Sequence, residues 1–212
     1  MPFIGAKPAN KAVVASDLDP AVITGQTALA VAPADTDEFL ISDAGTLKRI
    51  DASLVGGGGI TEADQWRITA NKTGLGDFTS NWERNDTTGF GYLGTGMSES
   101  SGIFTFPSTG IWLVKFNKCG KHVGTDSYSI RTSIMTTTDN SSYSEASSGV
   151  INAFQDGATM SSEENILFDC TSTSTHKVKF NFSASVRSGA ETFLGNTDKN
   201  LTYATFIRLG DT

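Results

Sequence analysis

The chain has 212 residues, with 16 Lys and Arg against 23 Asp and Glu, and its formal net charge is -7. This length accommodates one or two domains, and a domain of about 150 residues buries about 70% of its unfolded surface without a covalent staple. The acidic balance and the scattered basic residues exclude a nucleic-acid-binding surface, which needs clustered Lys and Arg. The longest basic neighbourhood, at Lys115, Lys118 and Lys121, is expected to be a solvated strand edge.

The start of the chain, at residues 1–5, lacks the basic and apolar regions of a secretion signal. No window approaches the roughly 18 apolar residues of a membrane span. We therefore expect a protein made in a cytoplasm, without membrane insertion. Cys119 and Cys170 match no zinc-binding spacing, so reduced, partly buried thiols are expected, with a disulfide formed outside the cell as the alternative.

The first part of the chain, about residues 1–34, shows neither a helical nor a strand period and is expected to be extended, apart from one short helical turn at 16–20. A hairpin is predicted next. Residues 39–42 form its first strand, residues 43–45 its turn, and residues 46–50 its returning strand. A lone hairpin is marginally stable in water, so this one is expected to pair with other copies or to dock on a partner.

Four consecutive glycines, Gly56 to Gly59, mark a flexible joint, because each lacks a β-carbon. The predicted organisation is therefore an N-terminal segment of residues 1–59 and a domain of residues 60–212.

Residues 60–212 are rich in Ser, Thr, Gly, Asn and aromatics, and the fold class predicted for them is all-β. In residues 177–184, apolar Val178, Phe180 and Phe182 alternate with polar residues, which indicates a strand with one buried face. Many short strands with turn-rich connections are typical of a sandwich or jelly roll. The expected strands are 65–70, 78–84, 102–106, 110–119, 128–137, 149–154, 164–170, 176–185, 190–194 and 201–209.

The run at residues 101–116 is the most informative one. Two strands flank a Pro-Ser-Thr-Gly turn at 107–110, in which proline and glycine favour chain reversal. In the second strand Trp112, Val114 and Phe116 point to one side, whereas Ile111 and Leu113 are apolar on the other. A strand with one solvated face alternates cleanly, so this pattern predicts a second cover, such as a neighbouring subunit.

The search for catalytic motifs finds none of the GxSxG, P-loop or HExxH patterns. His122 is expected to be an exposed turn residue, and His176 has no partner histidine at ligand spacing. Two carboxylate pairs, Glu163 with Glu164 and Glu83 with Asp86, match glycosidase chemistry, but solvated edges are the favoured interpretation. Three loop aspartates lack the spacing of a calcium loop, so no metal, catalytic residue or cofactor is predicted: Asp126, Asp139 and Asp156.

Aromatic residues in strands are more often packing or interface residues than ligand contacts. Trp66, Trp82 and Trp112 are therefore assigned to packing. Tyr128 and Tyr143, in regions rich in Ser, Gly and Asp, are the candidates for contact with a receptor such as a surface glycan.

The run Gly102-Ile-Phe-Thr-Phe-Pro-Ser-Thr-Gly-Ile-Trp112 resembles the Gly-x-Phe-Thr-x-Pro-x-x-Gly-x-Tyr signature of the complement globular-head and tumour-necrosis-factor-like jelly roll. Residues 201–209 are similar to that family's closing strand, and the resemblance covers about residues 64–211. It implies a trimeric jelly roll, with a subunit interface that we place at Ile111, Leu113, Tyr203 and Phe206. No collagen stalk or receptor-contact motif accompanies it, so the function of the animal members does not transfer.

The front of the chain resembles a different class. Residues 1–8 and the run Asp37-Glu-Phe-Leu-Ile-Ser-Asp-Ala-Gly-Thr-Leu-Lys-Arg-Ile-Asp51 look like start segments of virion structural proteins and short tail fibres of tailed bacteriophages. The resemblance implies a virion anchor that uses apolar groups, among them Pro2, Phe3, Ile4, Phe39 and Ile41.

The combined expectation is a non-enzymatic homotrimer on the virion surface, assembled in the host cytoplasm, whose N-terminus binds other virion proteins of the capsid or tail. A short fibre for host adhesion competes with a decoration protein that stabilises the head. A polysaccharide depolymerase and a cellular lectin-like module are the alternatives from other classes.

Overall fold

The computed structural model describes residues 36–55, 59–122, 128–153, 156–186 and 192–212. It also describes residues 25, 27, 31, 33 and 34. The chain divides into two compact units, Met1–Gly58 and Gly59–Thr212. The helical turn expected at 16–20 and the anchor residues Pro2, Phe3 and Ile4 lie outside the described residues.

The first unit contains the predicted hairpin. Strand β1 (Glu38–Asp43) pairs antiparallel with β2 (Thr46–Asp51), and a short 3-10 helix, η2 (Ala52–Leu54), follows. Ala44 and Gly45 have φ angles of 48° and 83°, the left-handed pair that a tight two-residue hairpin turn requires. Every residue of β1 is exposed, so this strand buries no side chain within the described part of the hairpin.

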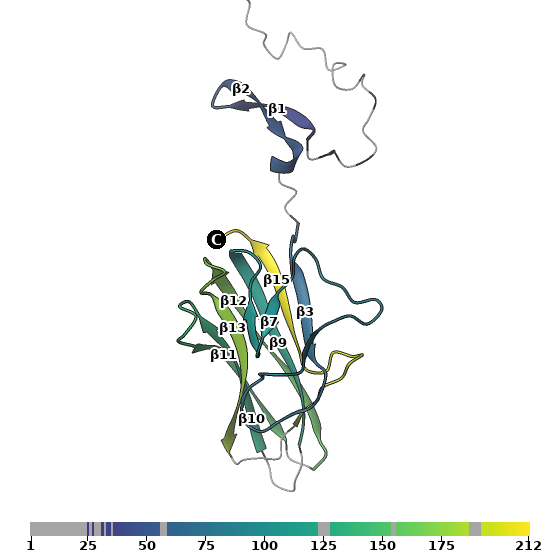
Figure 1. Cartoon of the computed structure of the whole chain (residues 1–212), viewed down its shortest axis with the longest axis vertical. Coiled ribbons are helices and arrows are strands. Elements are labelled where there is room, and N and C mark those ends of the chain that lie inside the picture. Colours follow the sequence, from purple (N-terminus) through teal and green to yellow (C-terminus); the bar gives the residue numbers. More distant parts are fainter. Residues whose placement is uncertain are drawn as a thin grey trace, which may run out of the picture. The chain divides into compact units, whose positions relative to one another are not determined.

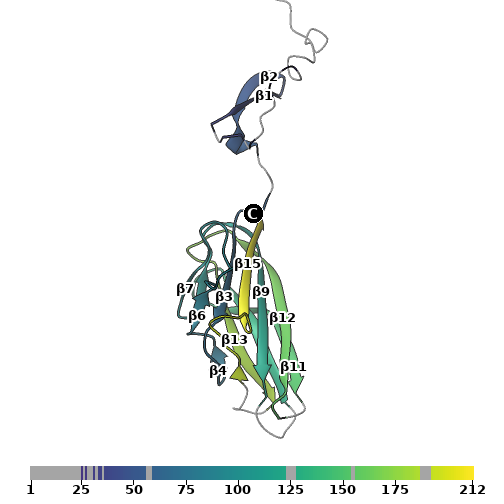
Figure 2. The same ribbon diagram turned by 90° about the vertical axis from the view of Figure 1, so that its right-hand side faces the viewer.

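The second unit is a jelly-roll sandwich of two antiparallel sheets (Figures 1 and 2). The first sheet has the order β11-β10-β13-β8-β7, and β5 also pairs with β13. Its strands are β11 (Ser144–Ala153), β10 (Tyr128–Thr137), β13 (Lys177–Val186), β8 (Ile103–Thr105), β7 (Ser98–Ser100) and β5 (Gly76–Asp77).

The second sheet has the order β4-β14-β9-β15-β3-β6, and β12 pairs with β9. Its strands are β4 (Lys72–Thr73), β14 (Thr192–Phe193), β9 (Gly110–Lys121), β15 (Tyr203–Gly210), β3 (Ala63–Ile68), β6 (Trp82–Arg84) and β12 (Thr159–Cys170). Strands distant in the chain are neighbours in both sheets, as in other jelly rolls.

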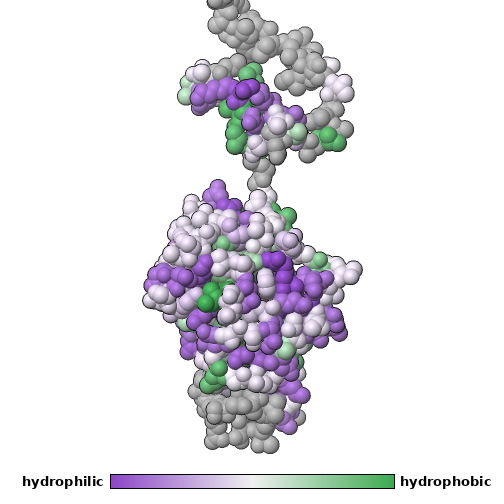
Figure 3. Space-filling view, in the orientation of Figure 1, coloured by the Kyte–Doolittle hydropathy of each residue, from purple (hydrophilic) through white to green (hydrophobic). Residues whose placement is uncertain are grey.

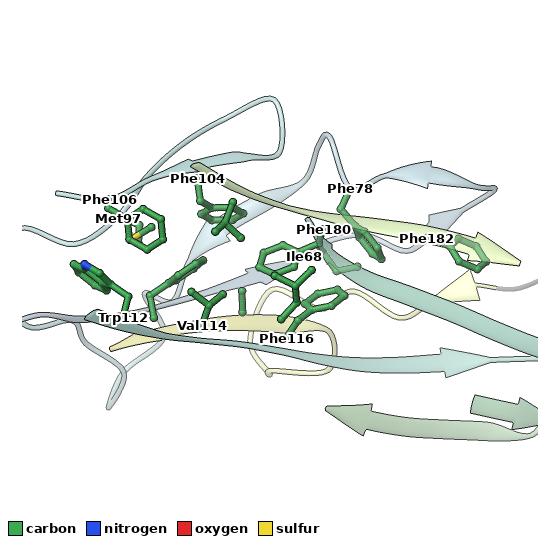
Figure 4. Close-up of a cluster of buried hydrophobic side chains, with 14 of the residues drawn as sticks. Ile68, Phe78, Met97, Phe104, Phe106, Trp112, Val114, Phe116, Phe180 and Phe182 are labelled. Atoms are coloured by element: carbon green, nitrogen blue, oxygen red, sulfur yellow. The ribbon is translucent and has the colours of Figure 1, made fainter. Parts of the chain in front are cut away.

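Aromatic rings from both sheets form the core (Figure 4). Trp112, Val114 and Phe116 extend from β9 into the space between the sheets, where the Phe116 ring stacks on Phe180 of β13 at 4.4 Å between centroids. Trp66 and Trp82 pack against this cluster and Trp112 lies inside it, so the assignment of all three tryptophans to packing is confirmed.

Four expectations about single side chains are wrong. Lys118 and His122, expected at a solvated edge and in an exposed turn, have no exposed surface, and Glu164 of the carboxylate pair is 4% exposed. Phe206, expected at the subunit interface, is also fully buried within the chain's own core. Lys118, Glu164 and Phe206 point inward because the strands that carry them place alternate residues between the sheets.

Candidate functional site: an apolar row on the second sheet

Four apolar side chains form a row across the outward side of the second sheet. Because Val114 and Phe206 point into the core, their chain neighbours Leu113 and Ile207 point to the opposite side. The register places Ile207 opposite Leu113, and it places Ala63 and Leu167 opposite these two on the flanking strands. We call these four residues the apolar row: Ala63, Ile207, Leu113 and Leu167.

Leu167 is the most exposed member of the apolar row, with 67% of its surface accessible. It lies on β12, whose described pairing is with β9. Burying a leucine side chain is worth about 1.5–3 kcal/mol. The exposed apolar surface at this strand therefore favours contact with another molecule.

Polar residues follow the apolar row along the same face. Gln65 Nε2 donates to Thr205 Oγ1 at 3.0 Å, and Lys115 lies 2.9 Å from the Glu163 carboxylate. Tyr203, opposite Asn117 on β9, is half-buried on this face. The face thus combines the apolar row with groups that form hydrogen bonds, which is the composition of many subunit interfaces.

A hollow of about 280 Å³ opens at the β3 end of the apolar row. Its sheet side is formed by Ala63, Gln65, Thr205 and Ile207, and its other wall is the loop of Gly91, Tyr92 and Leu93. Tyr92 and Leu93 are about half exposed, at 53% and 48%. The face therefore carries a projecting leucine at one end and an apolar hollow at the other.

The loop that walls the hollow is held by a buried carboxylate. One oxygen of Asp64 accepts from Met97 N at 2.8 Å, from Trp66 Nε1 at 2.9 Å and from Arg84 Nε at 3.1 Å. The Arg84 guanidinium also lies 4.6 Å from the ring centre of Tyr92. Asp64 thereby fixes the loop through both the backbone and Arg84, so the hollow is preformed.

Of the four predicted interface residues, three lie on the outward face: Ile111 and Leu113 on β9, and Tyr203 on β15. Phe206 is corrected, because a side chain fully buried in one copy has no surface left for a second copy. Sequence reasoning missed Leu167, Ile207 and Ala63. Leu167 and Ile207 had a local signal, because each is adjacent to apolar core residues on its strand, as Leu113 is. Only the strand pairing shows that they and Ala63 join Leu113.

The remaining predicted contact residues lie on other elements of the chain. Phe39 and Ile41 lie on β1 and are 42% and 38% exposed. Tyr128 begins β10. The Tyr143 ring lies 4.3 Å below the Lys179 ammonium, and burial raises the pKa of its hydroxyl. Tyr143 lies between β10 and β11, outside the apolar row.

The candidate catalytic carboxylates are occupied by cations. Glu83 and Asp86 both bind the buried guanidinium of Arg67, at 3.1 and 2.7 Å. Asp139 caps its own turn by accepting from Thr137, Ser141 and Ser142. Within the described ranges, no group of three His, Cys, Asp or Glu residues is arranged for a metal ion. Cys119 and Cys170 are both free thiols.

Among the described residues, no helix is long and apolar enough to cross a membrane. The viewed face of the second unit in Figure 3 is mostly white and purple, with small, separate green areas. Exposed apolar groups on that face are therefore scattered.

Comparison with known proteins gives the fold. No protein-family model matches the sequence, and no curated protein matches it. Among solved structures, murine APRIL at pH 5.0 is 12% identical, covering 70% of this chain and 98% of its own, with a TM-score of 0.50. Eiger TNF from S. frugiperda is 10% identical, covering 73% of this chain and 96% of its own, with a TM-score of 0.52. The chain therefore has a jelly roll of the tumour-necrosis-factor type.

Proposed function

We propose that the protein is a non-enzymatic structural component of a bacteriophage virion. It acts as a homotrimer, with residues 1–59 anchored in the particle and residues 60–212 displayed as a knob. The observation that carries the assembly is the outward face of the second sheet, where the apolar row ends in an exposed leucine on one side and a hollow on the other. The resemblances of the front segments support the virion assignment.

The two ends of the apolar row favour a cyclic assembly. Leu167 and the hollow belong to different parts of one surface, so the contact that joins them is heterologous, with Leu167 of one copy in the hollow of the next. Heterologous contacts build closed rings when the rotation between copies closes. Three copies are the number that the sequence resemblance to the jelly-roll family implies.

Trimerisation strengthens a weak anchor. The exposed apolar residues of β1, among them Phe39 and Ile41, form a small contact surface on each copy. When three such hairpins are joined, the second and third bind at a raised effective concentration, so the assembly holds far more tightly than one copy. A three-fold protein also matches symmetric sites on a capsid or tail.

Short-fibre and head-decoration roles share this architecture and differ in the docking site. The fibre role, with adhesion to a host glycan, is our first choice because the front segments resemble short tail fibres. The test is imaging of particles that carry the chain with residues 60–212 deleted. Loss of density from the tail supports the fibre, loss from the head supports decoration, and particles without any change contradict the proposal.

A further inference from the structure

A lysine and a glutamate are enclosed together between the sheets. Lys118 of β9 and Glu164 of β12 have side chains with 0% and 2% of their surface exposed. Lys118 Nζ contacts Glu164 Oε1 and Thr132 Oγ1, and it donates to Gly149 O at 3.3 Å. Strands of both sheets, β9 and β12 from one and β10 and β11 from the other, therefore meet at this amine and carboxyl group.

The absence of a side chain at Gly149 makes this approach possible. A β-carbon built at this position would lie 2.8 Å from Lys118 Nζ and 2.8 Å from Glu164 Oε1. Distances this short essentially never occur in real contacts, so a side chain at 149 would displace the ends of Lys118 and Glu164 from their present positions. Glycine at 149 thus leaves the room that the two groups occupy.

Burial opposes the charged form of both groups. Burial lowers the pKa of Lys118 and raises the pKa of Glu164, while the hydrogen bond between them acts in the opposite direction. A buried ion pair loses hydration that its mutual attraction only partly replaces. Amide formation requires the amine with a free lone pair and the carboxyl group in its protonated form, and burial acts toward both.

We propose that Lys118 and Glu164 condense into an intramolecular amide that covalently joins β9 to β12. The lone pair of Nζ attacks Cδ of the protonated carboxyl group, while the Thr132 hydroxyl donates to Oε1 and stabilises the charge that develops there. Oε2, which has no hydrogen-bond partner among the described residues, leaves with its own proton and one from Nζ as water. One C–N bond forms and one C–O bond breaks, without an oxidant, reductant or cofactor.

Contact and orientation replace an external catalyst in this step. Holding two reactants in position converts a bimolecular reaction into an effectively unimolecular one, with effective concentrations of about 10⁵ M or more. The amide closes a loop between residues 46 apart in the chain. It also replaces an amine and a carboxyl group, both costly to bury, with a single neutral amide.

The test is the intact mass of the purified full-length protein, followed by peptide mapping. We expect a mass lower than that of the sequence by one water molecule, and a branched peptide that joins the segments around Lys118 and Glu164. Lys115 and Glu163 provide an internal control, because this pair bridges the same two strands but is about one-third exposed to solvent. Their peptides are expected to remain unbranched.

Two variants distinguish formation of this amide from other reactions that lower the mass by one water molecule. Lys118→Met is expected to have the full mass of its sequence. Glu164→Gln, which is isosteric, releases ammonia in place of water, so its mature mass should equal that of the mature wild type. A wild-type protein that keeps the full sequence mass after prolonged incubation at neutral pH would overturn the proposal, and this measurement does not depend on the folding of any variant.

Discussion

Leu113 of β9 lies directly opposite Ile207 of β15, and both side chains point away from the core of their own chain. Each is flanked along its strand by core residues, Val114 and Phe206, that have no exposed surface. The sheet therefore has an aromatic core on one side and an apolar strip on the other. Such a two-sided sheet is more fully stabilised when a second layer covers the strip.

Leu113→Asp is expected to abolish self-association. The aspartate would place a charge in the centre of the apolar row, where it has to be desolvated when copies meet. Sedimentation velocity at micromolar concentration should show a monomer in place of the trimer that we propose for the wild type. Leu75→Asp is the matched control, because Leu75 is 52% exposed and lies outside the apolar row. An intact trimer of Leu113→Asp would place the interface elsewhere.

Asp64→Asn is expected to destabilise the second unit by about 3 kcal/mol, since hydrogen bonds to a charged group contribute about 1.5–3 kcal/mol and Asp64 accepts several. The amide loses the charge that faces Arg84 and has one acceptor oxygen in place of two. Chemical denaturation should show a lower midpoint with an unchanged slope. Asp211→Asn, at a residue whose side chain is 92% exposed, should stay within about 0.5 kcal/mol. Equal effects in both variants would contradict this role of Asp64.

Phe180→Ala is expected to lower the free energy of unfolding by about 3–5 kcal/mol, because it removes a ring from the centre of the core and leaves a cavity. Phe180 is fully buried and contacts aromatic rings from both sheets, including Phe116 and Phe104. The measurement is equilibrium unfolding followed by tryptophan fluorescence. Phe90→Ala, at a residue 42% exposed, is the control. A loss of less than 1 kcal/mol at Phe180 would mean that the core repacks around the cavity.

The turn at Asp139 predicts a specific pH dependence. Hydrogen bonds from Ser142 N, Thr137 Oγ1 and Ser141 N hold the pKa of this carboxyl group below its ordinary value. A carboxyl group with a lowered folded-state pKa stabilises the fold above its unfolded pKa of about 3.9, and this contribution is lost as the pH falls below that value.

Asp139→Asn removes this contribution at every pH. The difference in unfolding free energy between wild type and variant should therefore be largest near neutral pH and shrink as the pH is lowered from about 5 to about 3. Denaturant titrations at stepped pH give this difference directly. A difference that stays constant across the range would show that the charge of Asp139 does not contribute to stability.

Much of the local structure in both units could be predicted from local patterns. The strand 128–137 was expected with the bounds that β10 has, and the alternation of Val178, Phe180 and Phe182 gave the buried face of β13. The hairpin turn at 43–45 also has a local cause, because Ala44 and Gly45 adopt the positive φ angles of a tight turn. These features depend on neighbouring residues alone, which is why the sequence is sufficient for them.

The placement of single polar side chains depended on strands far apart in the chain. Lys118 looked like a solvated edge residue because its neighbours are polar, yet Glu164, Thr132 and Gly149 come from other strands to enclose it. The sequence by itself determined the all-β class, the longer strands such as β9, β10 and β13, and the apolar face around Leu113, whereas β4, β5 and β7 were not expected. Only the tertiary structure decided which charges are buried and which apolar residues join Leu113, because both depend on pairing between distant segments, which no local pattern encodes.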